Sequence, residues 1–123
     1  MVCVILIAED EVIVRNFVRH ILQADGHVVL AAADGYEALE LSRKYAGTID
    51  MLITDVKMPR MDGLELIERL QKERPKMRIL IMSGYAGEMR IQESGFPFVH
   101  KPFLASFFRS KVREMLGDEG TNS

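Results

Sequence analysis

From Val2 to Ala32 the chain reads VCVILIAEDEVIVRNFVRHILQADGHVVLAA. Two segments of this stretch, Val2–Ala8 and Val28–Ala32, are continuous apolar runs of strand length. The apolar residues between them follow the spacing of an amphipathic helix, namely Val14, Phe17, Val18, Ile21 and Leu22. Gly26 ends this helical pattern. Because continuous apolar runs are typical of parallel strands covered on both faces, the stretch predicts a strand, a helix and a second, parallel strand.

The same alternation continues to the end of the chain. Further strand-length apolar runs are Met51–Thr54, Ile79–Met82 and Phe96–Val99. The helical patterns between and after them carry Ala38, Leu39 and Ser42, then Leu64, Ile67 and Leu70, then a short segment from about Gly87 to Glu93, and finally Leu104, Phe107, Phe108, Val112 and Met115. Five strands and five helices predict an α/β fold with a single doubly wound parallel sheet. We expect one domain over residues 1–117, followed at 118–123 by a disordered tail or the start of a linker.

The composition excludes several classes of protein. With 48% hydrophobic and 28% charged residues, the chain resembles a soluble globular domain. Its net charge of -2 creates no basic field, so we expect no direct binding to nucleic acid. The opening apolar run is too short to span a membrane. Cys3 is the single cysteine and lies in an apolar run, which predicts a buried thiol and a reducing compartment. We therefore expect a cytoplasmic protein.

Chemically reactive side chains stand where the predicted strands end. Glu9 and Asp10 follow the first strand, Asp55 ends the third, Ser83 follows the fourth and Lys101 follows the fifth. In a parallel sheet these ends meet at one edge, which is where ligands bind. The converging carboxylates would repel one another unless a cation lay between them, and Mg2+ prefers such oxygen ligands. One aspartate could then accept a phosphoryl group while the lysine and serine contact its oxygens.

Four motifs resemble the receiver domains of two-component response regulators. They are ILIAEDE at residues 5–11, DVKMPRMDG at 55–63, MSGY at 82–85 and FVHKPF at 98–103. The match runs from about Val4 to Leu116, and the motifs taken together are specific for this family. The resemblance implies a flavodoxin-like sheet with the strand order 2-1-3-4-5. It also suggests, more weakly, a receiver from a hybrid histidine kinase.

The resemblance further implies a magnesium site. Asp55 would be the phosphoacceptor and would bind Mg2+ directly, together with Asp10 and the backbone carbonyl of Lys57. Glu9 would hold the ion through water.

The resemblance also implies a switch. Ser83 and Lys101 would contact the phosphoryl oxygens, and Phe98 would be the aromatic side chain that moves inward on activation. The bond from Lys101 to the following proline would be cis. Lys57 and Tyr85 would flank the phosphoryl site, and the fourth helix would be shorter than in many relatives.

Other polar residues have simpler interpretations. We expect Glu11 only to cap the first helix, and Asp62-Gly63 to form a turn that begins a helix. The histidines show no ligand spacing and are expected to be solvated or capping: His20, His27 and His100. Phe107, Phe108 and Met115 are expected to pack on the sheet, with some share in a partner face.

The predicted function is that of a signalling phosphoacceptor that assists its own phosphorylation and dephosphorylation. Its donor would be a histidine kinase or a histidine phosphotransfer protein, docking near the first helix. Its output would be a downstream protein target, a covalently linked effector domain or a phosphorylation-dependent dimer.

Three other functions share part of this residue pattern. A phosphatase of the haloacid dehalogenase class needs a second aspartate where Lys57 stands. In a flavin mononucleotide carrier, the acidic Glu9-Asp10-Glu11 segment would repel the phosphate. A pseudo-receiver, which binds partners as a scaffold without being phosphorylated, stays open.

Overall fold

The computed structural model of the protein describes residues 2–84 and 88–117. Within these residues, five strands alternate with five helices. The strands are β1 Val4–Ala8, β2 Val28–Ala32, β3 Met51–Asp55, β4 Arg78–Ser83 and β5 Phe98–His100. The helices are α1 Val12–Ala24, α2 Gly35–Lys44, α3 Gly63–Glu73, α4 Glu88–Ser94 and α5 Ala105–Leu116. Tyr85 and the predicted tail at 118–123 lie outside the described residues.

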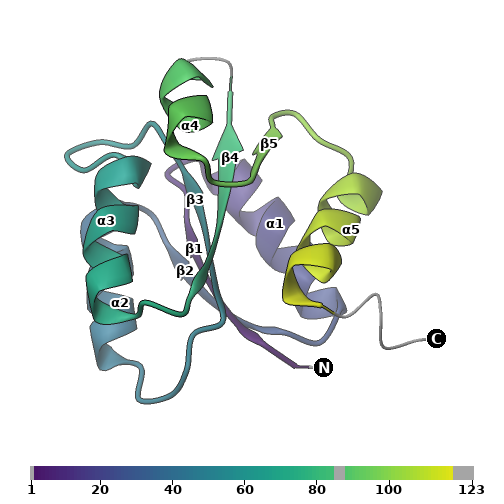
Figure 1. Ribbon diagram of the computed structural model, residues 1–123. Helices are drawn as coiled ribbons and strands as arrows, with labels where there is room; N and C mark the ends of the chain where they lie inside the picture. Colours follow the sequence, from purple (N-terminus) through teal and green to yellow (C-terminus); the bar gives the residue numbers. More distant parts are fainter. Residues whose placement is uncertain (1, 85–87, 118–123) are drawn as a thin grey trace.

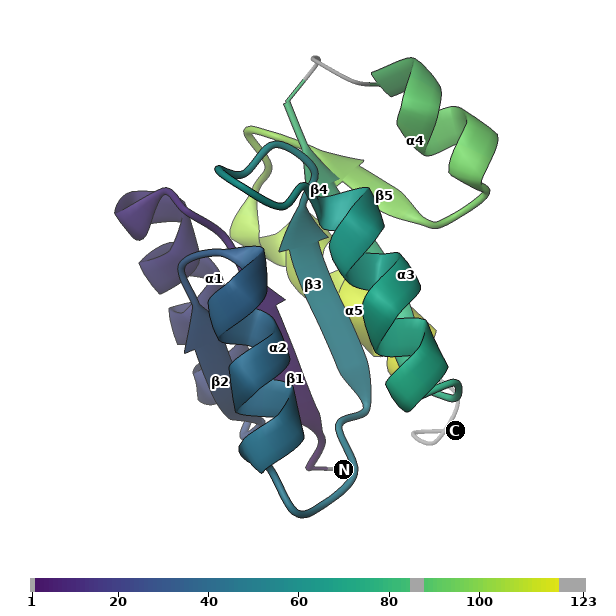
Figure 2. The same cartoon turned by 90° about the vertical axis from the view of Figure 1, so that its left-hand side faces the viewer.

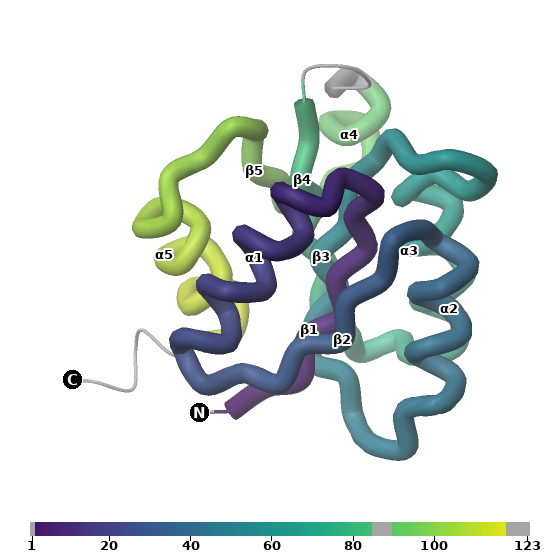
Figure 3. Tube along the Cα trace, turned by 180° about the vertical axis from the view of Figure 1, so that it is seen from behind, coloured from purple at the N-terminus to yellow at the C-terminus, as the bar shows by residue number. Residues whose placement is uncertain are grey.

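The strands form one parallel sheet in the order β2-β1-β3-β4-β5. Helices α1 and α5 cover one face, and α2, α3 and α4 cover the other (Figure 1, Figure 2 and Figure 3). Since successive strand residues point to opposite faces, Ile5 and Ile7 pack with α1 and α5, whereas Leu6 and Ala8 pack with α2 and α3. Burial on both faces explains the continuous apolar runs, and the predicted doubly wound fold is confirmed.

Short polar turns begin and end the helices. Asp34 accepts a hydrogen bond from the Glu37 N–H at 2.8 Å, and Asp62 accepts one from the Glu65 N–H at 2.9 Å. Both side chains cap a helix, and the cap at Asp62 confirms the helix start predicted there. Gly26, just after α1, has a φ of 90°, a conformation that side chains other than glycine rarely adopt, and this confirms the predicted stop.

The predicted packing of α5 is partly wrong. Phe108, Val112 and Leu116 are buried against the sheet, but Phe107 is 56% exposed and Leu104, at the start of the helix, is 75% exposed. Adjacent residues on a helix point about 100° apart, so only one of two neighbouring phenylalanines can face the sheet. The exposed apolar side chains lie beside the edge where the strands end.

Two further predictions need correction. His27 is buried rather than solvated, because its Nδ1 accepts the backbone N–H of Cys3 at 3.1 Å. The last strand begins at Phe98 rather than Phe96, since Pro97 has no N–H to donate to a strand ladder.

Cys3 is buried, as expected. Among the described helices, none is long and apolar enough to cross a membrane.

Candidate functional site

The candidate site lies at the edge of the sheet where the strands end (Figure 1). Asp55 and Ser83 are the last residues of β3 and β4, while Glu9 and Lys101 directly follow β1 and β5. The backbone N–H of Lys101 donates to the Ser83 carbonyl at 2.7 Å, which aligns the ends of the neighbouring strands. The structure therefore brings together residues that are far apart in the sequence.

Lys101 lies at the centre of the site. Its Nζ atom is 2.6 Å from Glu9 Oε1, 2.8 Å from Asp55 Oδ2 and 3.4 Å from Glu11 Oε1. Burial by itself lowers the pKa of Lys101, but the adjacent carboxylates of Asp55 and Glu9 outweigh burial and hold the pKa above its usual value. Lys101 is therefore a fixed positive charge at neutral pH.

Asp55 is held through its backbone and through one carboxylate oxygen. Its Oδ1 accepts the N–H of Val56 at 2.7 Å and that of Lys57 at 3.4 Å. The Thr54 hydroxyl donates to the Asp55 carbonyl at 2.8 Å. Gly63 packs against the same carbonyl so closely that a Cβ atom added to it would lie 2.0 Å from the oxygen. These contacts leave the Oδ2 atom of Asp55 facing the centre of the site.

Glu9 is a fully buried carboxylate with one incompletely paired oxygen. Its Oε2 accepts the Glu11 N–H at 3.0 Å. Its Oε1 lies close to Lys101 Nζ but receives no well-aligned hydrogen bond from the described residues. Burial raises the pKa of Glu9 to about 7, against the opposing effects of the Lys101 ammonium group and the Glu11 N–H. A carboxylate in this state would be stabilised by an additional cation.

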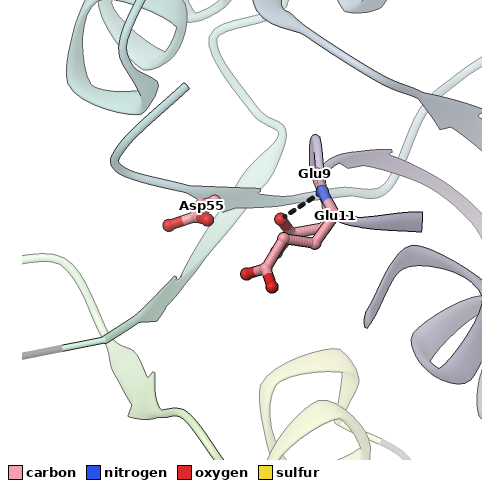
Figure 4. A group of neighbouring side chains, drawn as sticks. All are labelled: Glu9, Glu11 and Asp55. Atoms are coloured by element: carbon pink, nitrogen blue, oxygen red, sulfur yellow. Dashed lines mark hydrogen bonds between the residues drawn. The ribbon is translucent and has the colours of Figure 1, made fainter. Parts of the chain in front are cut away.

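The donor atoms at the site fit a hard divalent cation. Carboxylate oxygens of Glu9, Glu11 and Asp55 lie within 4.8 Å of one another, and Figure 4 shows the three side chains around the strand ends. Mg2+ prefers oxygen ligands of this kind. Glu9 Oε1 receives no well-aligned hydrogen bond from the described residues, so it can also face a bound cation although Lys101 Nζ lies 2.6 Å away.

The arrangement of the acidic segment differs from the prediction. Asp10 is exposed and stands outside this group of three; with Lys57 it lines a neighbouring cavity of about 360 Å³. Glu11 belongs to the group instead. It is the N-cap residue of α1, as expected, but its side chain makes no capping hydrogen bond and lies near Lys101, so it does more than cap the helix. Glu11 has extended backbone angles, whereas Asp10 lies in a bend between β1 and α1. This local geometry, which no periodic pattern in the sequence predicts, brings Glu11 rather than Asp10 into the group with Glu9.

The predicted switch residues lie on β4 and β5. Ser83 is buried, and its hydroxyl donates to the Gly84 carbonyl rather than towards the carboxylates. Phe98 is half-buried, and its ring meets the His100 ring edge to face at a centroid distance of 5.2 Å. The bond between Lys101 and the next residue is cis, as the resemblance implied.

Comparisons with known proteins agree with this arrangement. A family model described as the response regulator receiver domain matches residues 5–113. The sensor kinase CckA of Brucella abortus is 37% identical over 116 residues, which cover 91% of this chain but only 12% of that kinase. Sporulation initiation phosphotransferase F of Bacillus subtilis is 30% identical, covering 91% of this chain and 92% of that protein.

Solved structures show the same fold. The receiver domain of the hybrid histidine kinase CckA superimposes with a TM-score of 0.79 at 35% identity, covering 92% of this chain and 98% of that one. A CheY-like receiver domain protein from Methanospirillum hungatei has a TM-score of 0.82 at 26% identity, and both chains are covered completely, at 100%.

Proposed function

Because the chain belongs to the response regulator receiver family, we propose that it is a phosphoacceptor that takes a phosphoryl group onto Asp55. The observation that carries this proposal is the contact of 2.8 Å between Asp55 Oδ2 and the Lys101 ammonium group, at the enclosed end of the sheet. This contact supports the proposal, because a carboxylate next to a fixed positive charge is the pairing that phosphoryl transfer to an aspartate requires.

The side chains of this chain would divide the reaction between them. A carboxylate oxygen of Asp55 attacks phosphorus, while the Val56 N–H holds the other oxygen in place. The bond from phosphorus to the donor's histidine nitrogen breaks, and the nitrogen keeps the electron pair. Lys101 binds one phosphoryl oxygen. The Ser83 hydroxyl leaves the Gly84 carbonyl and donates to another.

The proposed cofactor is Mg2+. The residues that would hold it are Asp55 and Glu9, from the carboxylate group, and Asp10 with the Lys57 carbonyl, from the neighbouring cavity. When bound, it would neutralise the carboxylates and the negative charge on the transferring oxygens.

The proposed switch follows from the rotation of Ser83. Once its hydroxyl turns towards the phosphoryl group, the space behind the end of β4 becomes available to the half-buried Phe98. An inward movement of this ring would change the surface formed by α4, β5 and α5. This surface would then bind a downstream protein target, a linked effector domain or a second receiver.

A histidine kinase or a phosphotransfer protein is the proposed donor. Exposed apolar side chains lie beside the site on α1, at Val12, Ile13 and Phe17, and at the start of α5, at Leu104 and Phe107. Exposed apolar groups gathered around a reactive centre are typical of a protein docking surface. The exchange would take place in the cytoplasm, where such kinases present their phosphohistidine.

The test is the intact mass of the chain after incubation with Mg2+ and acetyl phosphate. We expect a gain of one phosphoryl group that EDTA abolishes and that Asp55→Asn removes. The matched control is Asp25→Asn, at the far end of α1, which should be phosphorylated like the wild type. If the wild type gains no phosphoryl group, or if Asp55→Asn gains as much, the proposal fails and the scaffold function of a pseudo-receiver takes its place.

A further inference from the structure

Glu11 is the part of the site that the family resemblance does not account for. Its side chain is 64% exposed, yet its Oε1 atom lies 3.4 Å from Lys101 Nζ. Its carboxylate is also within 4.8 Å of those of Glu9 and Asp55 (Figure 4). The backbone N–H of Glu11 donates to Glu9, which holds the residue at the rim of the site.

The number of hydrogen-bond donors on Lys101 limits what the site can hold. An ammonium group has three N–H donors, and three carboxylates surround this one. Glu9 and Asp55 lie closer to it and are largely or wholly buried, whereas Glu11 makes the longest contact and is the most exposed. A phosphoryl oxygen that binds Lys101 therefore displaces Glu11 more readily than either of the other two.

We propose that Glu11 is a positioning residue with two opposing effects: its charge attracts Mg2+ to the site, and its contact with Lys101 delays the binding of the phosphoryl group. The inference rests on the proposed function of Asp55 and adds a residue that sets the rate of that reaction. Removing the charge of Glu11 should weaken Mg2+ binding and, at saturating Mg2+, speed phosphorylation.

Glu11 takes no covalent part in the reaction used in the test. With acetyl phosphate, a bond forms between an Asp55 oxygen and phosphorus, and the bond from phosphorus to the acetyl oxygen breaks. Acetate leaves with the electron pair, and no proton needs to be transferred. Glu11 therefore acts only through Lys101 and through its charge.

The experiment compares Glu11→Gln, Glu11→Asp and the wild-type chain. The Mg2+ dissociation constant is measured by NMR titration with MgCl2, and the phosphorylation rate by intact mass at saturating Mg2+ with acetyl phosphate. For Glu11→Gln, loss of a charge near a divalent ion should raise the dissociation constant about three- to tenfold. The rate should rise about two- to fivefold, the range expected for releasing an exposed ion pair.

Glu11→Asp separates the two effects. It keeps the charge but is one methylene too short to reach Lys101, so Mg2+ affinity should stay near that of the wild type while the rate should resemble that of Glu11→Gln. Glu68→Gln, an exposed residue on α3, is the matched control and should change neither quantity. Thermal unfolding of every variant shows whether it is folded.

The outcomes distinguish this inference from the proposed function. If the wild type is phosphorylated and Glu11→Gln either changes nothing or lowers both Mg2+ affinity and rate, the inference is overturned and Asp55 keeps its role. If the wild type is not phosphorylated at all, both are overturned.

Discussion

Gly63→Ala is the substitution whose effect the structure defines most directly. Gly63 is the first residue of α3, and its backbone N–H donates to the Val56 carbonyl at 2.8 Å. An added Cβ would lie 2.0 Å from the Asp55 carbonyl oxygen, 2.9 Å from its carbon and 3.1 Å from the Val56 Cα. All three neighbours are backbone atoms at the end of β3, so no side-chain rotation can make room.

The expected loss of stability is large for a single methyl group. In an open helix, replacing glycine by alanine stabilises by about 1 kcal/mol. Here α3 must move away from β3, and overpacking against rigid neighbours usually costs about 1 to 3 kcal/mol. Because the clash involves only backbone atoms, we place its cost at the upper end of this range. After the helix gain is subtracted, we expect a net loss of about 2 kcal/mol, which for a chain of this size lowers Tm by roughly 8 °C.

Urea unfolding followed by circular dichroism measures this loss, and phosphorylation by acetyl phosphate reports on the displacement of Asp55. Gly84→Ala is the matched control for stability, because no atom of the described residues, its chain neighbours aside, lies within 4 Å of its added Cβ and the residue stands at the same edge of the sheet. An unfolding free energy for Gly63→Ala within about 0.5 kcal/mol of the wild type, the usual range for surface substitutions, would refute the reasoning.

Lys101→Met removes the ammonium group that neutralises the buried carboxylates of the site, so the free energy of unfolding in EDTA should fall by about 3 to 5 kcal/mol. Mg2+ should restore part of this loss, and urea unfolding with and without Mg2+ is the measurement. The pKa of Glu9 is about 7 in the folded chain against an ordinary 4.5. As the pH falls from 7 to 4.5, the carboxyl group of Glu9 takes up a proton in the folded chain before it does so in the unfolded chain. The free energy of unfolding of the metal-free wild type should therefore rise relative to that of Glu9→Gln over this pH range. A constant difference between the two free energies would contradict the burial argument. Arg74 makes four hydrogen bonds to residues 42–47, so Arg74→Met should cost about 2 to 3 kcal/mol in thermal unfolding, whereas the exposed Lys76→Met should cost less than about 0.5 kcal/mol.

Much of the candidate site could be predicted from the order of residues along the chain. Asp55 and Lys101 are 46 positions apart, yet each comes at the end of an apolar run of strand length. A parallel sheet brings such ends together without any knowledge of side-chain conformation. The contact of 2.8 Å between their side chains is the consequence.

The directions of individual side chains could not be predicted in the same way. The apolar periodicity of the last helix does not show which of Phe107 and Phe108 faces the sheet. In the structure only Phe108 does. The sequence does not indicate that His27 is buried. Its hydrogen-bond partner is the backbone N–H of Cys3, which is 24 positions away and comes close only when the chain folds.

The sequence by itself determined the class of fold, the order of the elements and the set of residues at the strand ends, because these depend on hydrophobic periodicity and on the position of polar residues along the chain. Only the tertiary structure decided which acidic side chains surround Lys101. Glu11, rather than Asp10, lies in the carboxylate group around it, 90 positions away in the sequence. The physical reason is that this choice depends on the backbone angles at the start of α1 and on how β5 is placed beside β4, and neither leaves a periodic pattern in the sequence.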